Sequence, residues 1–222
     1  MDKRSSYGTM SFGGNGYMKN NNGYMNYLLL AVGLAAVVGA GYFGYRWYVV
    51  SREQSAQVMF AECLREYEKG ARERQTWADI QALWAAGYAR HTQSSLAPYF
   101  KAFEANSALK QDKKAEAVAL LDAALSLVAA SSPLYTVYAT KRALINIDLG
   151  NETGLQELEK LAYDKNNVQR DVALYYLGLY QWSKNNIEDA KEAWETLTAL
   201  PDSPEQTTLW TALAEQKLQQ IA

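Results

Sequence analysis

Few residues in this sequence could carry out acid–base, nucleophilic or metal chemistry, and they lie far apart. The chain has one histidine, His91, and one cysteine, Cys63. A metal centre or a nucleophile–base pair needs several such groups at matching spacing, which neither residue has. The carboxylates fall on amphipathic helical patterns, where they are typical of a solvated helix face. We therefore predict a protein that is not an enzyme and that has no catalytic residues, cofactor or metal.

Each of these two residues has a structural interpretation instead. Cys63 lies on the apolar face of a predicted helix, so we expect it to be buried. Because it is alone, it cannot form an internal disulfide. His91 follows Arg90 at a predicted helix end, where an exposed cationic side chain interacts favourably with the helix dipole.

Two short motifs match known patterns without the context that those patterns need. Residues 39–44 spell G-x-G-x-x-G, the dinucleotide fingerprint. That motif works where a short strand turns into a helix, whereas the apolar stretch before residue 39 is too long for a typical strand. Residues 151–153 match the glycosylation acceptor pattern, which is weak evidence by itself. We assign no function to either motif.

The candidates for binding are apolar and aromatic side chains along the first helices of predicted helix pairs. In tandem helix pairs these first helices line a groove that accepts a peptide, and exposed aromatic side chains are its usual anchors. The groove-facing residues are predicted to be Val172, Tyr175, Leu179 and Trp182 in the last pair, and Val137, Thr140, Leu144 and Ile147 in the pair before it. For Leu144 and Ile147, packing against a neighbouring helix is an equal alternative to lining the groove.

Residues 27–45 form an uninterrupted apolar stretch that Arg46 ends. As a helix this stretch is ~28 Å long, close to the thickness of the hydrocarbon core of a bilayer. Tyrosine and tryptophan rings, which prefer the headgroup layer, flank it at Tyr24 and Trp47. We predict one transmembrane helix at residues 27–50.

The sequence leaves two questions about this anchor open: whether it is cleaved as a signal peptide, and whether it contacts another helix. Residues 38–40 resemble a signal-peptide cleavage site, but the apolar stretch continues beyond Ala40, which favours an uncleaved anchor. Small residues at Ala36, Ala40 and Gly44 are four positions apart. They would let another helix approach closely, so homo-oligomer formation or contact with a partner helix stands beside simple exposure to lipid.

The composition differs on the two sides of the anchor. Residues 1–26 are rich in Gly, Asn, Ser, Tyr and Met, cannot bury a core, and are predicted to be a disordered tail. Residues 51–222 suffice for one domain and carry 18 of the 22 basic and 23 of the 24 acidic side chains, for a net charge of −5. Because phosphate contacts need clustered Lys and Arg, this balance argues against nucleic acid as a partner.

Residues 51–222 show helical periodicity and helix-capping signals, and no alternation of period two. Thr76 with Asp79 forms a predicted capping box, and Ser132 is a predicted N-cap before a proline. A charged stretch at residues 70–75 is expected to end the first helix. The predicted helices are residues 51–69, 77–90, 95–110, 113–129, 133–149, 152–164, 168–184, 187–199 and 204–221.

These helices form repeating pairs. The last pair, residues 168–199, has the spacing of a tetratricopeptide repeat around Gly178, Ala190 and Trp194. Small residues let the two helices cross closely, and larger ones fill the seam; in the preceding pair Leu155 departs from this rule. The predicted fold is all-α: an N-terminal transmembrane helix followed by a tetratricopeptide repeat-like α-solenoid of antiparallel helix pairs at residues 51–222.

Six stretches carry a resemblance to a known family: residues 80–86, 97–100, 115–121, 141–145, 176–178 and 188–194. With these stretches, the layout of residues 27–200 resembles the bacterial ancillary subunit of the Sec translocon, a family with a tetratricopeptide repeat-like domain. The resemblance implies a single-pass protein of the bacterial inner (cytoplasmic) membrane, with a cytoplasmic N-terminus and the repeat domain in the periplasm. It implies translocon subunits, periplasmic chaperones or unfolded chains as protein partners, and no catalytic residues.

Two functions of different classes follow as expectations. The first is a non-enzymatic, membrane-anchored scaffold for protein–protein interaction, an accessory to the Sec translocon and periplasmic chaperones. The second is a structural or assembly subunit of an envelope complex, without a substrate-binding groove. An exposed apolar groove favours the first, and a groove filled by the protein's own helix favours the second.

Overall fold

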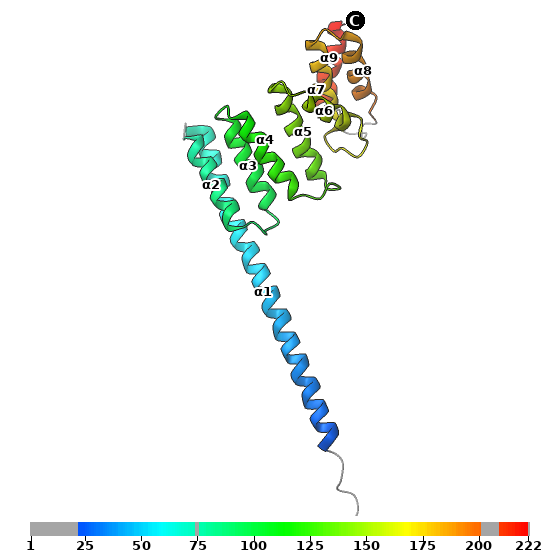
Figure 1. Ribbon diagram of the computed structural model, residues 1–222. Coiled ribbons are helices and arrows are strands. Elements are labelled where there is room, and N and C mark those ends of the chain that lie inside the picture. The colour runs from blue at the N-terminus through cyan, green and yellow to red at the C-terminus, as the bar shows by residue number, and fades with distance from the viewer. Residues whose placement is uncertain (1–21, 74–75, 201–208, 222) are drawn as a thin grey trace, which may run out of the picture. The chain divides into compact units, whose positions relative to one another are not determined.

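The computed structural model describes residues 22–73, 76–200 and 209–221, without the side chains of residues 22–32, 35–36 and 71–73. Every regular element in these ranges is an α-helix, as predicted (Figure 1). The helices are α1 (Asn22–Glu73), α2 (Trp77–Arg90), α3 (Ala97–Leu109), α4 (Lys114–Ser126), α5 (Pro133–Asp148), α6 (Glu152–Tyr163), α7 (Arg170–Ser183), α8 (Ile187–Thr198) and α9 (Leu209–Ile221). The chain divides into one unit of residues 1–50 and another of residues 51–222.

Helix boundaries in the second unit follow the local signals closely. Asp112, Gly150 and Asn185 have φ angles of 60°, 76° and 62° and stand at the turns within the pairs α3–α4, α5–α6 and α7–α8. Asp, Asn and Gly tolerate this left-handed conformation better than other residues do. Ser132 caps α5 as predicted, because its hydroxyl accepts a hydrogen bond from the Leu134 amide at 3.3 Å. These turns fix where each pair folds back on itself.

Three local predictions are wrong. Helix α1 begins at Asn22, so residues 22–26 of the predicted tail are helical, while residues 1–21 lie outside the described part. The same helix continues through the charged stretch to Glu73, since charged side chains suit an exposed helix and one interior glycine, Gly70, costs only about 1 kcal/mol. The Thr76 hydroxyl donates to the carboxylate of Asp79 instead of accepting from a backbone amide, so the capping box does not form.

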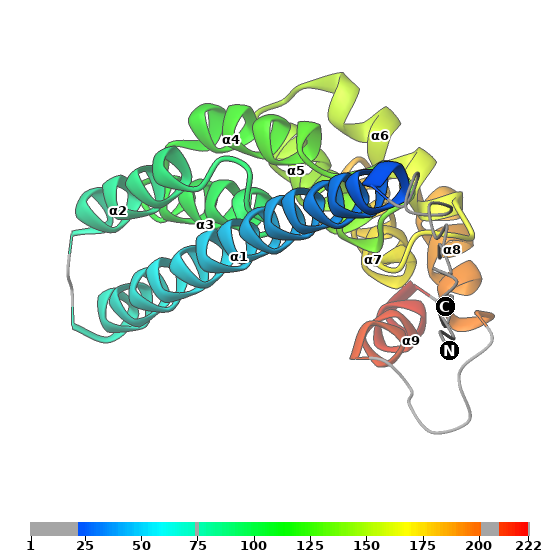
Figure 2. The ribbon, with the colours of Figure 1, turned by 90° about the horizontal axis from the view of Figure 1, so that it is seen from below.

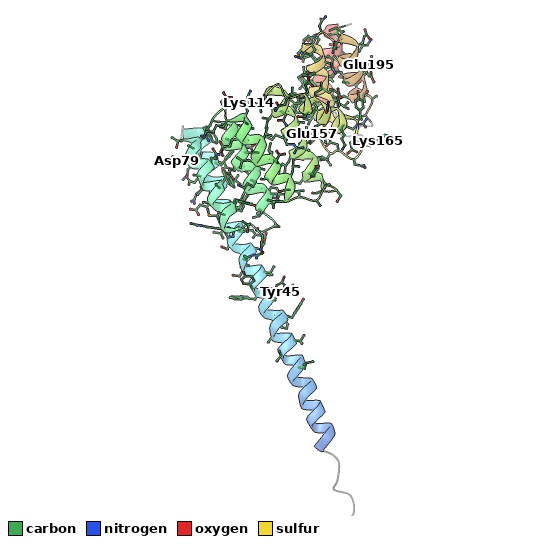
Figure 3. All side chains as sticks on the ribbon, viewed as in Figure 1. Tyr45, Asp79, Lys114, Glu157, Lys165 and Glu195 are labelled. Carbon is green, nitrogen blue, oxygen red and sulfur yellow. The ribbon has the colours of Figure 1, made fainter. Side chains whose placement is uncertain are left out.

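In the unit of residues 1–50, the large apolar side chains from Val37 to Val50 are exposed. Among them is Tyr45, whose side chain stands out from the helix in Figure 3. No helix within the described residues is long and apolar enough to cross a membrane. Of the predicted span, residues 27–32 and 35–36 have side chains outside the described part.

Helices α2 to α9 form a succession in which each packs against the next, and α9 also packs against α7. Figure 2 shows this order from α2 through α8, with α9 beside α7 and α8. Neighbouring helices in the chain are therefore neighbours in space. This is the arrangement of an α-solenoid-like fold.

The first core of the second unit joins α1, α2 and α3. The predicted apolar face of α1 is confirmed, because Ala56 and Cys63 are buried and the rings of Phe60 and Tyr67 pack beside them. At the centre Trp84 is fully buried and stacks on Phe103, with ring centroids 4.7 Å apart. Aromatic rings from three helices thus enclose the cysteine.

A second core extends from α3 to α9 and contains the predicted repeat signature. Trp194 is fully buried in the seam between α7 and α8, together with Ala190 and Leu174. A Cβ atom added at Gly178 would overlap the Trp194 indole, so the glycine is needed for this close approach. The predicted close crossing of the last two paired helices at Gly178, Ala190 and Trp194 is confirmed.

The middle pair uses a different small residue from the one that the repeat spacing indicates. Gly154 lies against α5, where an added Cβ would stand 2.8 Å from the Ala143 carbonyl oxygen and 2.8 Å from the Ile147 nitrogen. Leu155, one position later, packs at the edge of the core instead. The small residue that seemed to be missing is therefore present, shifted by one position.

Helix α5 is also held by an ion-pair network. The guanidinium of Arg142 contacts both the Asp122 carboxylate of α4 and the Glu157 carboxylate of α6, which Figure 3 labels. One side chain thereby links the second helix of one pair to both helices of the next. The link fixes α5, which forms one wall of the hollow described next.

Candidate functional site

A hollow of about 410 Å³ lies between α5 and α7, the first helices of two successive pairs. We call it the α5–α7 groove. Apolar and aromatic side chains predominate on its walls, and Asp148 at its edge is paired with Lys114 at 3.6 Å. The groove is lined by Lys141, Leu144, Ile145, Ile147, Asp148, Tyr176, Leu179, Tyr180 and Ser183.

The predicted groove residues are partly brought together here. Leu179 lines the groove, and so do Leu144 and Ile147, for which inward packing was an equal alternative. The aromatic members of the wall are Tyr176 and Tyr180, which the sequence analysis did not select. Because successive helical residues are about 100° apart, an assignment displaced by one position selects a different face of α7.

Tyr175 and Trp182 face the C-terminal helix instead. Tyr175 is buried, with its ring centroid 5.2 Å from that of Trp210 on α9. Trp182 is 36% exposed, lies 6.1 Å from the Trp194 ring, and has the Lys217 ammonium 4.2 Å above its own ring. The prediction that Tyr175 is an exposed groove anchor is therefore wrong, because α9 covers that face of α7.

The remaining predicted groove residues are not on the groove wall. Thr140 is buried, and its hydroxyl has no hydrogen-bond partner within the described residues. Val137 and Val172 are half-buried, and Val137 packs against the second core. The groove prediction fails for Thr140 because this face of α5 turns inward.

A second hollow, of about 390 Å³, opens beside the first and shares Lys141 with it. We call it the lysine pocket. It is lined by Tyr67, Asn106, Leu109, Lys110 and Lys141. Its side chains come from α1, the end of α3 and α5, so it continues the groove along the row of first helices.

The electrostatics of the lysine pocket are dominated by two ammonium groups. Burial lowers the pKa of Lys141, and the charge of Lys110 lowers it further. The Lys141 ammonium donates to the side-chain oxygen of Asn106. Lys110 lies 5.9 Å from the centroid of the Trp77 ring. Lys110 is exposed, whereas Lys141 is partly buried and therefore attracts a carboxylate more strongly than a solvated cation does.

The described lining of the groove and the lysine pocket is mostly apolar and aromatic, with two lysines between them. No group of His, Cys, Asp and Glu within the described residues could hold a metal ion. No known protein family, curated protein or solved structure matches this chain. The function must therefore be argued from the groove and the pocket themselves.

Cys63 and His91, the two residues considered first for chemistry, both pack against neighbouring side chains. Cys63 is buried, as predicted, and burial raises the pKa of its thiol to about 11, which keeps it protonated and unreactive. His91 stands at the C-cap of α2, as predicted, but its ring stacks on Phe100 at 6.3 Å and is not fully exposed. The prediction that His91 is solvent-exposed is therefore wrong, although its position at the end of α2 is as predicted.

A third hollow, of about 440 Å³, lies among α6, α7 and α8 and has the opposite charge. Glu159, Asp189 and Glu192 line it, and burial together with these carboxylates raises the pKa of Tyr163. Lys160 is its one basic lining residue among those described. A mostly acidic, polar hollow of this kind lacks the apolar surface that a peptide groove needs.

The predicted contact face of the anchor is only partly described. Ala40 and Gly44 are exposed, and a Cβ added at Gly44 would meet no atom within 4 Å. The side chain of Ala36 lies outside the described residues. Within this single chain the described part of the stripe is uncovered.

Sequence reasoning missed Lys110, Lys141, Tyr176 and Tyr180. A signal for Lys141 is present, because it stands three residues before Leu144 and therefore on the same helix face. Lys110 gives no such signal, since its place beside Lys141 depends on how α3 packs against α5. The pair emerges only from the tertiary structure.

Proposed function

We propose that this chain is a membrane-anchored, non-enzymatic scaffold that binds segments of partner proteins in the α5–α7 groove. The observation that carries the proposal is an open hollow with an apolar and aromatic lining, formed by the first helices of successive pairs. Such surfaces accept extended or helical peptides in tandem helix-pair folds. The proposal places partner recognition on α5 and α7.

The membrane anchor and the partners are part of the same proposal. The apolar run at residues 27–45 and the exposed aromatic side chains up to Tyr48 support an anchor. The resemblance to the ancillary Sec translocon subunit favours a single-pass protein of the bacterial inner membrane with a periplasmic repeat domain. Translocon subunits, periplasmic chaperones and unfolded chains are then the partners to test.

The groove proposal can be tested by site-specific photocrosslinking of the full-length chain in bacterial cells. A photoreactive residue in place of Leu179 should form adducts with translocon subunits, chaperones or emerging chains. The matched control replaces Glu188, which is exposed on α8 and does not line the groove. Equal adducts from both positions, or none from position 179, would reject the groove as the binding surface.

The anchor proposal has its own test. Carbonate extraction should leave the full-length chain in the membrane pellet, and protease added to spheroplasts should digest residues 51–222. A soluble product beginning near Gly41 would instead indicate a cleaved signal peptide. Full protection of residues 51–222 would reverse the proposed orientation.

A structural or assembly subunit is the second candidate, and α9 provides the observation that favours it. This helix covers the face of α7 that carries Tyr175 and Trp182, so part of the first-helix surface is filled by the protein's own chain. In that case adducts should come from positions on the anchor, such as Ala40, and not from the groove. Crosslinking at both positions separates the two candidates.

A further inference from the structure

We propose that the lysine pocket and the α5–α7 groove together bind an extended partner segment in which an acidic side chain stands between apolar residues. The inference rests on the proposed function and names the chemistry of the segment that the groove accepts. The acidic side chain would enter the lysine pocket, and an adjoining apolar side chain would lie between α5 and α7. Four observations lead to this assignment.

The first is that neither lysine has a carboxylate partner among the residues that the structure describes. Other cations nearby have carboxylate partners: Lys101 with Glu104 at 2.8 Å, and Lys113 with Glu116 at 4.0 Å. Within the described residues no carboxylate lies within 4.0 Å of the ammonium of Lys110 or Lys141.

The second is the contrast with the rest of the domain. Residues 51–222 have a net charge of −5, yet the described lining of the lysine pocket has two cations and no acidic residue. Asp148, the carboxylate among the described residues of the groove wall, is paired with Lys114. A partner carboxylate would relieve the repulsion between the two ammonium groups, which is a favourable change that a neutral partner cannot provide.

The third is the chemistry around the two cations. The Asn106 side-chain oxygen accepts a hydrogen bond from Lys141, which leaves the amide N–H₂ group of Asn106 as a further donor for a carboxylate. Tyr67 belongs to the same lining. A volume of about 390 Å³ has room for one acidic side chain and its backbone.

The fourth is that apolar surface lies beside each lysine. Leu144 and Leu179 line the groove that includes Lys141, and the rings of Tyr67 and Trp77, 5.3 Å apart, lie beside Lys110. An acidic residue inside a segment can place apolar neighbours on both surfaces, whereas a chain terminus has a neighbour on one side only. We therefore assign the carboxylate to a side chain and not to a C-terminus.

The test is calorimetric titration of the full-length protein in a mild detergent with end-blocked peptides. The probe is Gly-Leu-Val-Glu-Leu-Phe-Gly, acetylated and amidated, and its control carries Gln in place of Glu. We expect the acidic peptide to bind about tenfold more tightly than the control, with an advantage that shrinks as salt is added. Lys141→Gln and Lys110→Gln should each remove most of that advantage while circular dichroism shows an unchanged fold.

Lys165→Gln is the matched control variant. Lys165 is exposed, lies between α6 and α7, lines neither hollow, and is labelled in Figure 3. The Lys165→Gln variant loses the same charge as the other two variants, and its preference for the Glu peptide over the Gln peptide should stay intact.

The outcomes separate this inference from the proposed function. Equal affinity for both peptides, or a preference that survives both lysine variants, would overturn the inference and leave peptide binding in place. Equally tight binding of the Gln peptide with a free C-terminus would assign the pocket to chain ends and also overturn it. Absence of binding by every peptide would reject the inference together with the groove function.

Discussion

Trp194 is the side chain on which the last helix pair depends most. It is fully buried, it fills the space that Gly178 leaves open, and its indole nitrogen donates to the Tyr175 carbonyl at 3.2 Å. Trp194→Ala removes these contacts and leaves a cavity, so we expect the free energy of unfolding to fall by about 3–5 kcal/mol. Thermal melting of the full-length protein, followed by circular dichroism, measures the loss.

Trp182→Ala is the matched comparison, with the same change of side chain on the same helix pair. Because Trp182 is 36% exposed and contacts mainly the edge of Trp194 and the Lys217 ammonium, we expect a loss of only about 1–2 kcal/mol. If Trp182→Ala melts the protein as early as Trp194→Ala does, then Trp182 is a core residue and α9 is more firmly seated than its contacts suggest.

Because Cys63 is buried, we expect the free energy of unfolding to decrease at alkaline pH. Its folded-state pKa of about 11 lies above that of a solvated thiol, so the unfolded chain loses this proton first as the pH rises. The stabilising contribution is complete below pH ~8.5 and is lost on the way to the folded-state value. At pH 10 we expect the difference in stability between the wild type and Cys63→Ala to be smaller by roughly 1–2 kcal/mol than at pH 7.

Denaturant titrations at the two pH values provide that comparison. Tyrosines and lysines also titrate in this range, but they are common to both proteins and cancel in the difference. A difference that stays constant from pH 7 to pH 10 would contradict the burial of this thiol.

At the scale of single helices, Gly154 shows how closely α5 and α6 approach. Gly154→Ala adds a methyl group about 2.8 Å from backbone atoms of α5, and backbone cannot move aside as a flexible side chain can. We expect a loss of roughly 1–3 kcal/mol in the free energy of unfolding, although alanine is intrinsically the better helix former by about 1 kcal/mol.

Thr153→Ala, one position earlier on the exposed side of α6, is the control for this prediction. It improves helix propensity without adding a contact, so its melting temperature should be unchanged or slightly higher. If Gly154→Ala also stabilises the protein, then α5 and α6 are farther apart than the structure places them.

The sequence predicted elements better than it predicted faces. Helices and turns follow from local rules, such as the left-handed conformation that Asp112 and Asn185 adopt, and the described helices confirm them. The groove face depends on the rotation of α7 about its own axis, which packing against α9 decides. Because the sequence of α7 alone does not show this rotation, the prediction placed Tyr175 on the groove wall, where the structure has Tyr176. The pairing of Lys110 with Lys141 depends on three helices at once, and no local pattern records it.

At the scale of the whole molecule, α9 covers the end of the helical unit of residues 51–222. Tyr175 and Tyr176 both pack against Trp210, and Ala214 is buried in the second core. Ending the chain at residue 208 would expose these surfaces, so we expect a lower melting temperature and faster amide exchange in α7 and α8. Exchange in α2 should stay nearly unchanged, because the aromatic cluster around Trp84 does not include α9.

Mass spectrometry of deuterated peptides would follow all three helices in one experiment. Uniformly faster exchange from α2 to α8 would contradict this expectation and show that the domain unfolds as a single cooperative block.

The two cores each contain their own indole fluorophores. Trp77 and Trp84 belong to the aromatic cluster of α1, α2 and α3, whereas Trp194 and Trp210 belong to the α3–α9 core. Trp47 and Trp182 belong to neither cluster, so replacing these two and the tryptophans of one core with phenylalanine would leave an emission spectrum that reports on the other core. The protein therefore contains built-in optical probes for asking whether a partner peptide is sensed in the first core, in the second, or in both.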